Sequence, residues 1–292
     1  MTAPDSTDVF VEHRNLLFTV AYEMLGSAAD AEDVLQEAWL RWVDVDRAQV
    51  RDDRAYLVRI VTRLSLNRMR TNARRRETYV GPWLPEPLLT APDVAEDVEL
   101  ADSVSLAMLT VLETLGPTER AVFVLREVFD FGYDEIAAAV DKTPAAVRQI
   151  AHRARDHVAE RRPRTEATAA QYERVLRQFV VATTTGDVQA LMDVLAPDVV
   201  LVADGGGVKK AAVRPILGND KVARFLAGGA SGLPVDVEVL LVNGAPGLRI
   251  FLDGELDTIV SVALEGGLIT GLYAVRNPEK LGRVGSVVPL TR

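Results

Sequence analysis

The sequence predicts a multidomain protein in which two all-α segments precede a C-terminal α+β domain. Residues 9–76 and 101–162 carry apolar side chains at helical spacing with few breakers. Residues 81–100 hold four prolines and no sustained period, which indicates a linker. After residue 163 the chain turns to β-branched runs punctuated by glycine, which favours strands.

The first helical segment is expected to form three helices. One ends near Gly26-Ser27 and buries Phe10, Leu16, Leu17, Val20 and Met24. The second is capped by Ser27 or Asp30 and buries Val34, Leu35, Ala38, Trp39 and Trp42. The third runs from near Asp52 toward Arg76 and buries Leu57, Ile60, Val61 and Leu64.

The second helical segment ends in a helix-turn-helix pattern. Residues 133–140 and 143–162 form two expected helices, joined by a tight turn around Asp141-Lys142. Thr143 caps the second helix, and Pro144 stands at its first position, where a missing N–H costs nothing. The core stripe of that helix is Val147, Ile150, Ala151, Ala154 and Val158.

The C-terminal segment predicts helices followed by a curved antiparallel sheet. One helix or a pair is expected over residues 169–195. The strand candidates are VVLVAD, VDVEVLLVNG, LRIFLDG, DTIVSVALEGG and LITGLYAV. Their hairpin spacing favours a sheet with helices packed on one side.

Composition excludes several kinds of function. The chain has no cysteine, so disulfides and thiolate chemistry are excluded, and its three histidines lack the spacing of a metal site. We therefore expect no metal and no cofactor. No apolar run reaches the ~18–20 residues that cross a bilayer, and the first residues do not resemble a signal peptide. The expectation is a cytoplasmic protein without a membrane partner.

The net charge of −9 conceals a pattern along the chain. Residues 51–76 carry nine arginines against two acids, and residues 142–164 carry seven basic residues against two acids. Residues 84–119, between them, carry eight acids and no Lys or Arg. Because salt screens each field within ~8–10 Å, two local basic surfaces can engage phosphates on an anionic molecule.

Both basic surfaces map to single helix faces. On the third helix one face carries Arg59, Arg63, Asn67, Arg70 and Arg74, and no acid lies at i±4 to relieve their repulsion. The outward face of the last helix carries Ala145, Arg148, Gln149, His152 and Arg155. Arg suits guanine edges, Gln suits adenine, and Ala leaves room for a thymine methyl group. Solvated basic faces remain the alternative.

The helix over DAEDVLQEAWLRW has a charged face opposite its apolar stripe. That face carries Asp33, Gln36, Glu37, Leu40 and Arg41. Taken alone it could be a solvated face, but the string resembles the most characteristic helix of the sigma-70 family, in its extracytoplasmic-function (ECF) branch. The resemblance implies a transcription initiation factor that binds core RNA polymerase, through the β′ clamp and β flap regions, and promoter DNA.

The resemblance also assigns the DNA elements. It implies that the arginine-rich helix and the loop before it, Asp44–Asp53, handle the −10 element and hold bases of the opened strand in pockets. The helix-turn-helix would read the −35 element. The acidic linker would thread the basic channel of the polymerase between the two lobes, or would be a solvated tether.

Three short strings resemble the ECF group that carries a fused SnoaL-like domain of the nuclear-transport-factor-2 (NTF2) superfamily. They are WLPEP (83–87), DGGG (204–207) and NPEKL (277–281). The implied organisation is region 2 in 1–80, the linker in 81–100, region 4 in 101–163, a regulatory SnoaL-like cone in 164–283 and a tail in 284–292. The family places Lys directly after the third glycine, but here Val208 intervenes before Lys209 and Lys210.

Our hypothesis for these strings is an interdomain contact. Three glycines allow close backbone approach, so DGGG can grip another segment, and Trp83 is an apolar anchor on a proline-stiffened tether. The residues concerned are Trp83, Leu84, Pro85, Asp204, Gly205, Gly206, Gly207, Asn277, Pro278, Lys280 and Leu281. WLPEP would pack near DGGG and NPEKL and so place the two lobes. The alternative is that it covers a patch on its own lobe.

Two other functions stay open at this point. One is a helix-turn-helix regulator with a ligand-sensing domain, and the other is an enzyme on the SnoaL-like fold. A catalytic site would need side chains such as Asp204, Asp220, Asp253 and Tyr273, and no histidine follows His157. We expect no enzyme activity, and an unidentified small-molecule ligand in the cone is left open.

Overall fold

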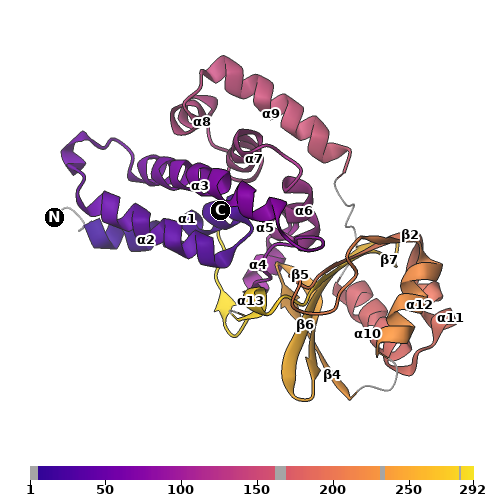
Figure 1. Ribbon diagram of the computed structural model, residues 1–292. Helices are drawn as coiled ribbons and strands as arrows, with labels where there is room; N and C mark the ends of the chain where they lie inside the picture. The colour runs from indigo at the N-terminus through magenta and orange to yellow at the C-terminus, as the bar shows by residue number, and fades with distance from the viewer. Residues whose placement is uncertain (1–5, 162–168, 231–233, 283) are drawn as a thin grey trace. The chain divides into compact units, whose positions relative to one another are not determined.

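The computed structural model describes residues 6–161, 169–230, 234–282 and 284–292 (Figure 1). Its chain forms two compact units, and each is described by itself. The helical unit comprises Met1–Glu77, Leu109–Arg162 and Pro289–Arg292. The sheet unit comprises Thr78–Met108 and Pro163–Val288.

The helical unit opens with three long helices, as predicted. They are α1 (Ser6–Leu25), α2 (Ala28–Val43) and α3 (Asp53–Glu77), with a short 3₁₀ turn, η1 (Arg47–Gln49), before α3. Of the two candidate caps for α2, Ser27 is the one used, because its side chain accepts a hydrogen bond from the Asp30 N–H. The buried side of α2 includes Trp42, which is fully inaccessible to solvent.

The helix-turn-helix is also confirmed. The second helical segment contains α6 (Leu106–Leu112), α7 (Pro117–Phe123), the π-helical turn η2 (Val124–Val128), α8 (Tyr133–Val140) and α9 (Pro144–Ala159). Asp141 adopts a left-handed conformation, with φ of 56°, and ends α8. Thr143 then caps α9 by accepting from the Ala146 N–H. Among the expected core residues of α9, Ile150 is half-buried and the other four are buried.

A buried arginine ties the two helical segments into one unit. Arg120 on α7 is 1% exposed, and its Nε donates to the Glu23 carbonyl oxygen at 2.8 Å. Arg120 and Arg76 both form ion pairs with the Glu113 carboxylate, and Arg76 Nη2 donates to the Leu25 carbonyl oxygen at 3.2 Å. Burial lowers the pKa of Arg120, and a paired carboxylate is what such a cation requires.

The sheet unit has an eight-stranded sheet in the order β3-β2-β7-β6-β5-β4-β1-β8. Its main strands are β2 (Leu195–Asp204), β4 (Val235–Val242), β5 (Ala245–Leu252), β6 (Glu255–Glu265) and β7 (Leu268–Val275). The shorter ones are β1 (Leu89–Thr90), β3 (Ile216–Leu217) and β8 (Val287–Val288). The α+β class is confirmed, but the sheet is mixed, because β2–β7 and β1–β8 pair in parallel. Hairpin spacing predicts only the sequential antiparallel pairs.

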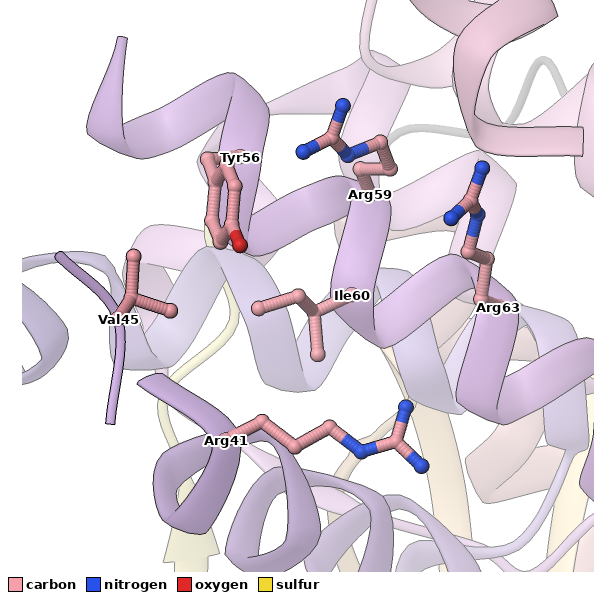
Figure 2. A pocket seen from close by; sticks show the side chains of 6 residues that line it. All are labelled: Arg41, Val45, Tyr56, Arg59, Ile60 and Arg63. Carbon is pink, nitrogen blue, oxygen red and sulfur yellow. The ribbon is translucent and has the colours of Figure 1, made fainter. Parts of the chain in front are cut away.

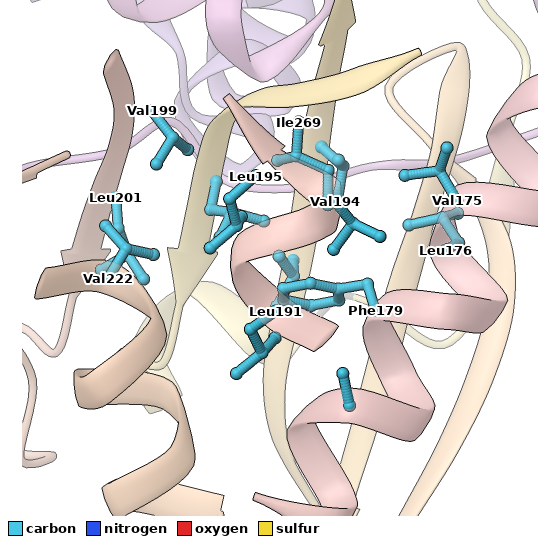
Figure 3. Packing of buried hydrophobic residues seen from close by; sticks show 14 of the residues in the cluster. Val175, Leu176, Phe179, Leu191, Val194, Leu195, Val199, Leu201, Val222 and Ile269 are labelled. Carbon is cyan, nitrogen blue, oxygen red and sulfur yellow. The ribbon is translucent and has the colours of Figure 1, made fainter. Parts of the chain in front are cut away.

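Three helices pack against one face of the sheet. They are α10 (Ala169–Thr185), α11 (Val188–Val194) and α12 (Asn219–Ala230). Side chains such as Leu176, Phe179 and Leu191 meet Leu201, Leu264 and Ile269 from the strands in a continuous apolar core (Figure 3). The space between these helices and the sheet is therefore filled with side chains.

The predicted linker is more ordered than its prolines indicate. Together with its flanking residues it contains β1, α4 (Pro92–Glu96) and α5 (Val98–Val104), and the whole stretch Thr78–Met108 belongs to the sheet unit. In describing contacts with the sheet, we use the word linker for residues 79–104. Leu84, Leu89 and Leu106 pack with Val202, Ile259 and Val275. Since neighbours in a strand point to opposite faces, this cluster covers the sheet face away from α10. The sequence pattern did not predict β1, because this strand depends on pairing with β4 and β8, which are distant in the chain.

The described parts of the chain lack membrane-spanning helices and metal-binding clusters. None of their helices is long and apolar enough to cross a membrane. Their His, Cys, Asp and Glu side chains form no group of three that could hold a metal ion.

Candidate functional site

The charged face predicted on α2 is exposed along its whole length. The five exposed side chains are Asp33, Gln36, Glu37, Leu40 and Arg41. Arg41 pairs with Glu37 at 2.7 Å, and Asp33 pairs with Arg68 of α3 at 3.2 Å. Leu40 stands 64% exposed among these charges. An apolar side chain framed by charges is the composition of a protein-binding surface.

The arginine face of α3 is partly engaged within the helical unit. Arg63 is exposed, yet its Nη2 donates to the Ala138 carbonyl oxygen at 2.9 Å, at the C-terminal end of α8. A helix C-terminus carries partial negative charge, so it relieves part of the repulsion along this face. Asn67 and Arg70 are exposed and hydrogen-bond to each other at 3.3 Å. The side chain of Arg74 lies outside the described residues.

A small cavity opens beside the first turns of α3. Its volume is about 200 Å³, and its lining side chains are Arg41, Val45, Tyr56, Arg59, Ile60 and Arg63 (Figure 2). The Arg59 guanidinium lies 4.6 Å from the centre of the Tyr56 ring. A cavity lined by one aromatic ring and three cations suits a planar, anionic ligand, and a nucleotide has both properties.

The outward face of α9 is exposed as predicted. Its side chains are Ala145, Arg148, Gln149, His152 and Arg155. Arg155 donates twice to the Glu127 carboxylate, at 3.2 and 2.9 Å. Arg148 lies 5.7 Å from the Tyr133 ring centre. Arg155 is therefore paired with a carboxylate of the same unit.

The three strings in the sheet unit converge on one buried carboxylate, that of Asp204. The Tyr79 hydroxyl donates to its Oδ1 at 2.6 Å, and the Leu84 N–H donates to its Oδ2 at 2.9 Å. The Gly206 N–H donates to Oδ1 at 3.0 Å, and Lys280 Nζ lies 2.7 Å from Oδ2. The acid of DGGG thus collects donors from the linker, from its own loop and from NPEKL. We call these residues the Asp204 cluster.

Lys280 joins the linker to the Asp204 cluster in a second way. Its ammonium group also donates to the Leu84 carbonyl oxygen. It lies 3.9 Å from the centre of the Trp83 ring and 5.0 Å from that of Tyr79. Cation–π attraction is strongest where the cation is desolvated, and Lys280 is 7% exposed. Leu84, fully buried, and Pro85 enclose the cluster on the linker side.

The remaining residues of DGGG and NPEKL shape the backbone around Asp204. A Cβ on Gly205 would collide with the Lys209 carbonyl oxygen, and one on Gly206, whose φ is +61°, would collide with the Asn277 amide. Gly207 follows, also at positive φ. Asn277 caps α13 (Pro278–Leu281), in which Pro278 takes the first position and Leu281 is buried. The Asn277 Nδ2 also donates to the Tyr79 hydroxyl at 2.8 Å.

Lys209, which stands one position later than the family's lysine because Val208 intervenes, forms an ion pair with Asp257. Lys209 Nζ lies 3.1 Å from Asp257 Oδ1, and Arg276 binds the other oxygen of that carboxylate at 2.8 Å. Burial opposes ionisation of Asp257, but the hydrogen bonds from Thr258 and Lys209 and the charge of Arg276 lower its pKa overall. Val208 itself is 70% exposed. The lysine therefore anchors the glycine loop from one position further along the chain.

Sequence reasoning missed Tyr79 in this cluster. Burial, followed by its hydrogen bond to Asp204, raises the pKa of the Tyr79 hydroxyl. A single tyrosine before a proline-rich string carries no signal, because its role depends on a partner far along the chain. The side chains considered for catalysis have separate environments: Asp204 is paired, Asp220 pairs with Arg224 on α12, and Asp253 lies exposed in the β5–β6 turn.

Comparisons with known proteins show similarity to sigma factors over both the helical and the sheet units. The family model for Sigma-70 region 2 matches residues 9–75, and that for Sigma-70, region 4 matches residues 105–158. The ECF RNA polymerase sigma factor SigJ of Mycobacterium tuberculosis is 36% identical over 91% of this chain and 90% of its own length. The probable ECF RNA polymerase sigma factor SigI of the same species is 32% identical, over 92% of both chains. The crystal structure of SigJ has a TM-score of 0.74 at 34% identity, covering 94% of this chain and 98% of that one.

The Asp204–Lys280 pair predicts a specific loss of stability. Lys280→Met leaves a buried carboxylate without its cation, which should destabilise the sheet unit by about 3–5 kcal/mol. Adding Asp204→Asn should recover part of that loss, because the uncompensated charge is removed. Native-state hydrogen exchange of the β6 and β7 amides measures the change.

Lys209→Met is the matched control for the Lys280→Met and Asp204→Asn variants. Its ammonium is 44% exposed, and Asp257 keeps Arg276, so a loss of at most about 1 kcal/mol is expected. Equal losses for Lys280→Met and Lys209→Met would contradict the central role of the Asp204 pair.

Proposed function

This chain belongs to the ECF family of RNA polymerase sigma factors. On that premise we propose which of its surfaces binds the polymerase and which bind the promoter elements. As a sigma factor it binds core RNA polymerase and directs it to promoter DNA. In the proposed organisation, residues 1–80 are region 2, 81–100 the linker and 101–163 region 4. Residues 164–283 are a regulatory domain and 284–292 a tail. The supporting observation is that α2, α3 and α9 each expose side chains suited to one partner. The α2 face suits the polymerase, the α3 face suits −10 DNA and the α9 face suits −35 DNA.

The α2 face is the proposed docking surface for the polymerase β′ clamp. Asp33 and Glu37 supply negative charge, and the exposed Leu40 supplies an apolar anchor on the same face. Such a combination supports both orientation and affinity, since charges steer the encounter and the buried anchor slows dissociation. Region 4 would contact the β flap.

The cavity beside α3 is the proposed receptor for an extruded base of the −10 element. Tyr56 offers an aromatic ring, and Arg41, Arg59 and Arg63 line the same cavity with positive charge. Stacking captures a base once it has left the duplex, and arginines hold the adjacent phosphates. Asn67, Arg70 and Arg74 would continue the contact along the strand.

The α9 face is the proposed reader of the −35 element. Arg148 and Gln149 are exposed near the N-terminal end of the helix, the end that meets base edges in helix-turn-helix proteins. Arg155 would exchange the Glu127 carboxylate for a DNA phosphate or a guanine edge. Ala145 and His152 complete the face.

The sheet unit is the proposed regulator in cis. The Asp204 cluster and the apolar cluster around Leu84 hold the linker on the sheet, and the linker joins region 2 to region 4. Holding it would set the span available between the two DNA-binding regions. A small-molecule ligand in the cone has less support, because apolar side chains pack the space between helices and sheet.

The docking proposal predicts loss of polymerase binding on charge reversal. Asp33→Arg with Glu37→Arg should lower co-purification with core RNA polymerase by at least about tenfold, because like charges then face the clamp. The control reverses two other exposed acids that are likewise paired with arginines, Glu173→Arg with Asp220→Arg. Equal recovery of polymerase by both double variants would refute the docking surface.

The pocket proposal predicts that Tyr56 senses a base. Tyr56→Leu keeps apolar volume beside Trp42 and removes the stacking face, worth about 1–3 kcal/mol per base. The holoenzyme's affinity for a single-stranded −10 oligonucleotide should therefore fall about 5- to 150-fold. An abasic nucleotide at the captured position should weaken the wild-type complex and leave the variant complex unchanged. If Tyr56→Leu weakened the intact and abasic strands equally, the pocket would not hold a base.

A further inference from the structure

The turn between β4 and β5 is buried, which is unusual for a hairpin turn. Asn243 is 0% exposed, whereas Asp253 and Gly254, which form the β5–β6 turn, are both exposed. Both turns have two residues at positive φ: 51° and 76° for Asn243-Gly244, and 53° and 81° for Asp253-Gly254. Their backbones are therefore alike, and what distinguishes the first turn is what covers it.

The linker covers the Asn243-Gly244 turn and is hydrogen-bonded to it. The Asn243 N–H donates to the Leu88 carbonyl oxygen, and Asn243 Oδ1 accepts from the Leu88 N–H, both at 2.9 Å. Asn243 Nδ2 donates to the Val104 carbonyl oxygen at 2.8 Å. The Gly244 N–H donates to Thr90 Oγ1 at 2.9 Å. One turn thus holds the linker before β1 and again at the end of α5.

The side chain at position 243 must satisfy two demands at once. It has to accept from one linker N–H and donate to one linker carbonyl oxygen, and a side-chain amide does both. It must also tolerate a left-handed backbone, as asparagine does in type I′ turns. Gly244 meets a steric demand, because a Cβ there would lie 2.7 Å from the Ala101 Cα on α5. A Cβ on Gly254 would meet nothing within 4 Å.

We propose that the Asn243-Gly244 turn is a positioning site that clamps the linker on the sheet, separate from the Asp204 cluster. The cluster holds residues 79–84 through charge, whereas the turn holds residues 88–104 through neutral hydrogen bonds and close packing. This step rests on the proposed function and on the expectation that the acidic linker threads a basic channel of the polymerase: the clamp would then compete with core RNA polymerase for the linker. Weakening the clamp should then let polymerase capture the linker at lower concentration.

The test compares the two turns in the full-length protein. Asn243→Gly removes only the clamping side chain, and the chain already uses a Gly-Gly pair in its β6–β7 turn, with φ of 59° and 82° at Gly266 and Gly267. Gly244→Ala adds the clash with α5. Asp253→Gly and Gly254→Ala make the same changes in the exposed turn and carry the same backbone effects.

Hydrogen exchange of the Leu88 amide is the first readout. Asn243→Gly and Gly244→Ala should speed its exchange by about tenfold or more, because the segment loses buried hydrogen bonds or its close packing. The two control variants should leave the rate within about twofold. If Asn243→Gly and Asp253→Gly behave alike, the clamp is refuted. Should Gly244→Ala fail to fold, Asn243→Gly decides the matter, since glycine carries no strain at that φ.

Run-off transcription over a range of core polymerase concentrations is the second readout. Asn243→Gly should reach half-maximal transcript at a core concentration at least about threefold lower than wild type, while Asp253→Gly should not. Faster Leu88 exchange with an unchanged polymerase requirement overturns the competition between clamp and polymerase. Failure of the proposed function would look different, because all variants and the wild type would then fail to direct transcription.

Discussion

The buried carboxylate of Asp204 is the constraint on which the arrangement of the sheet unit depends. It is fully enclosed, so it needs donors on all sides, and Lys280 with the Gly206 N–H supplies only some of them. The linker supplies the rest through the Tyr79 hydroxyl and the Leu84 N–H. Because Asp204 and Lys280 both belong to the C-terminal domain, the ion pair is preorganised and the linker completes its shell. Docking of the linker is therefore favourable, because it supplies the donors that the carboxylate still lacks.

Two kinds of contact hold the linker on the sheet. Charge and cation–π contact fix residues 79–84, while the Asn243-Gly244 turn and β1 pairing fix residues 88–104. A linker folded in this way cannot also thread a channel of the polymerase. Its acidic composition fits that channel, and its apolar residues Leu84 and Leu89 fit the sheet. We therefore propose that this one segment has two alternative sets of contacts, one on the sheet and one in the polymerase channel.

Sequence reasoning succeeded where the signal is local. The turn at Asp141 and Pro144 after Thr143 mark helix ends by short-range chemistry, Ser27 is one of the two caps considered for α2, and the three strings led to Asp204 and Lys280. It failed where partners are distant in the chain. β1 needs β4 and β8, Tyr79 needs Asp204, and Asn243 looks like any residue of a tight turn until the linker covers it. No periodicity or composition encodes such pairs.

The central claim is that the linker is docked on the sheet in the free protein and leaves it in the holoenzyme. Hydrogen exchange of the Leu84 amide, which donates to Asp204, tests it most directly when measured before and after adding core RNA polymerase. The account predicts slow exchange in the free protein and exchange at least about tenfold faster in the complex, without loss of protection in β6 and β7. Equal protection of Leu84 in both states would contradict it.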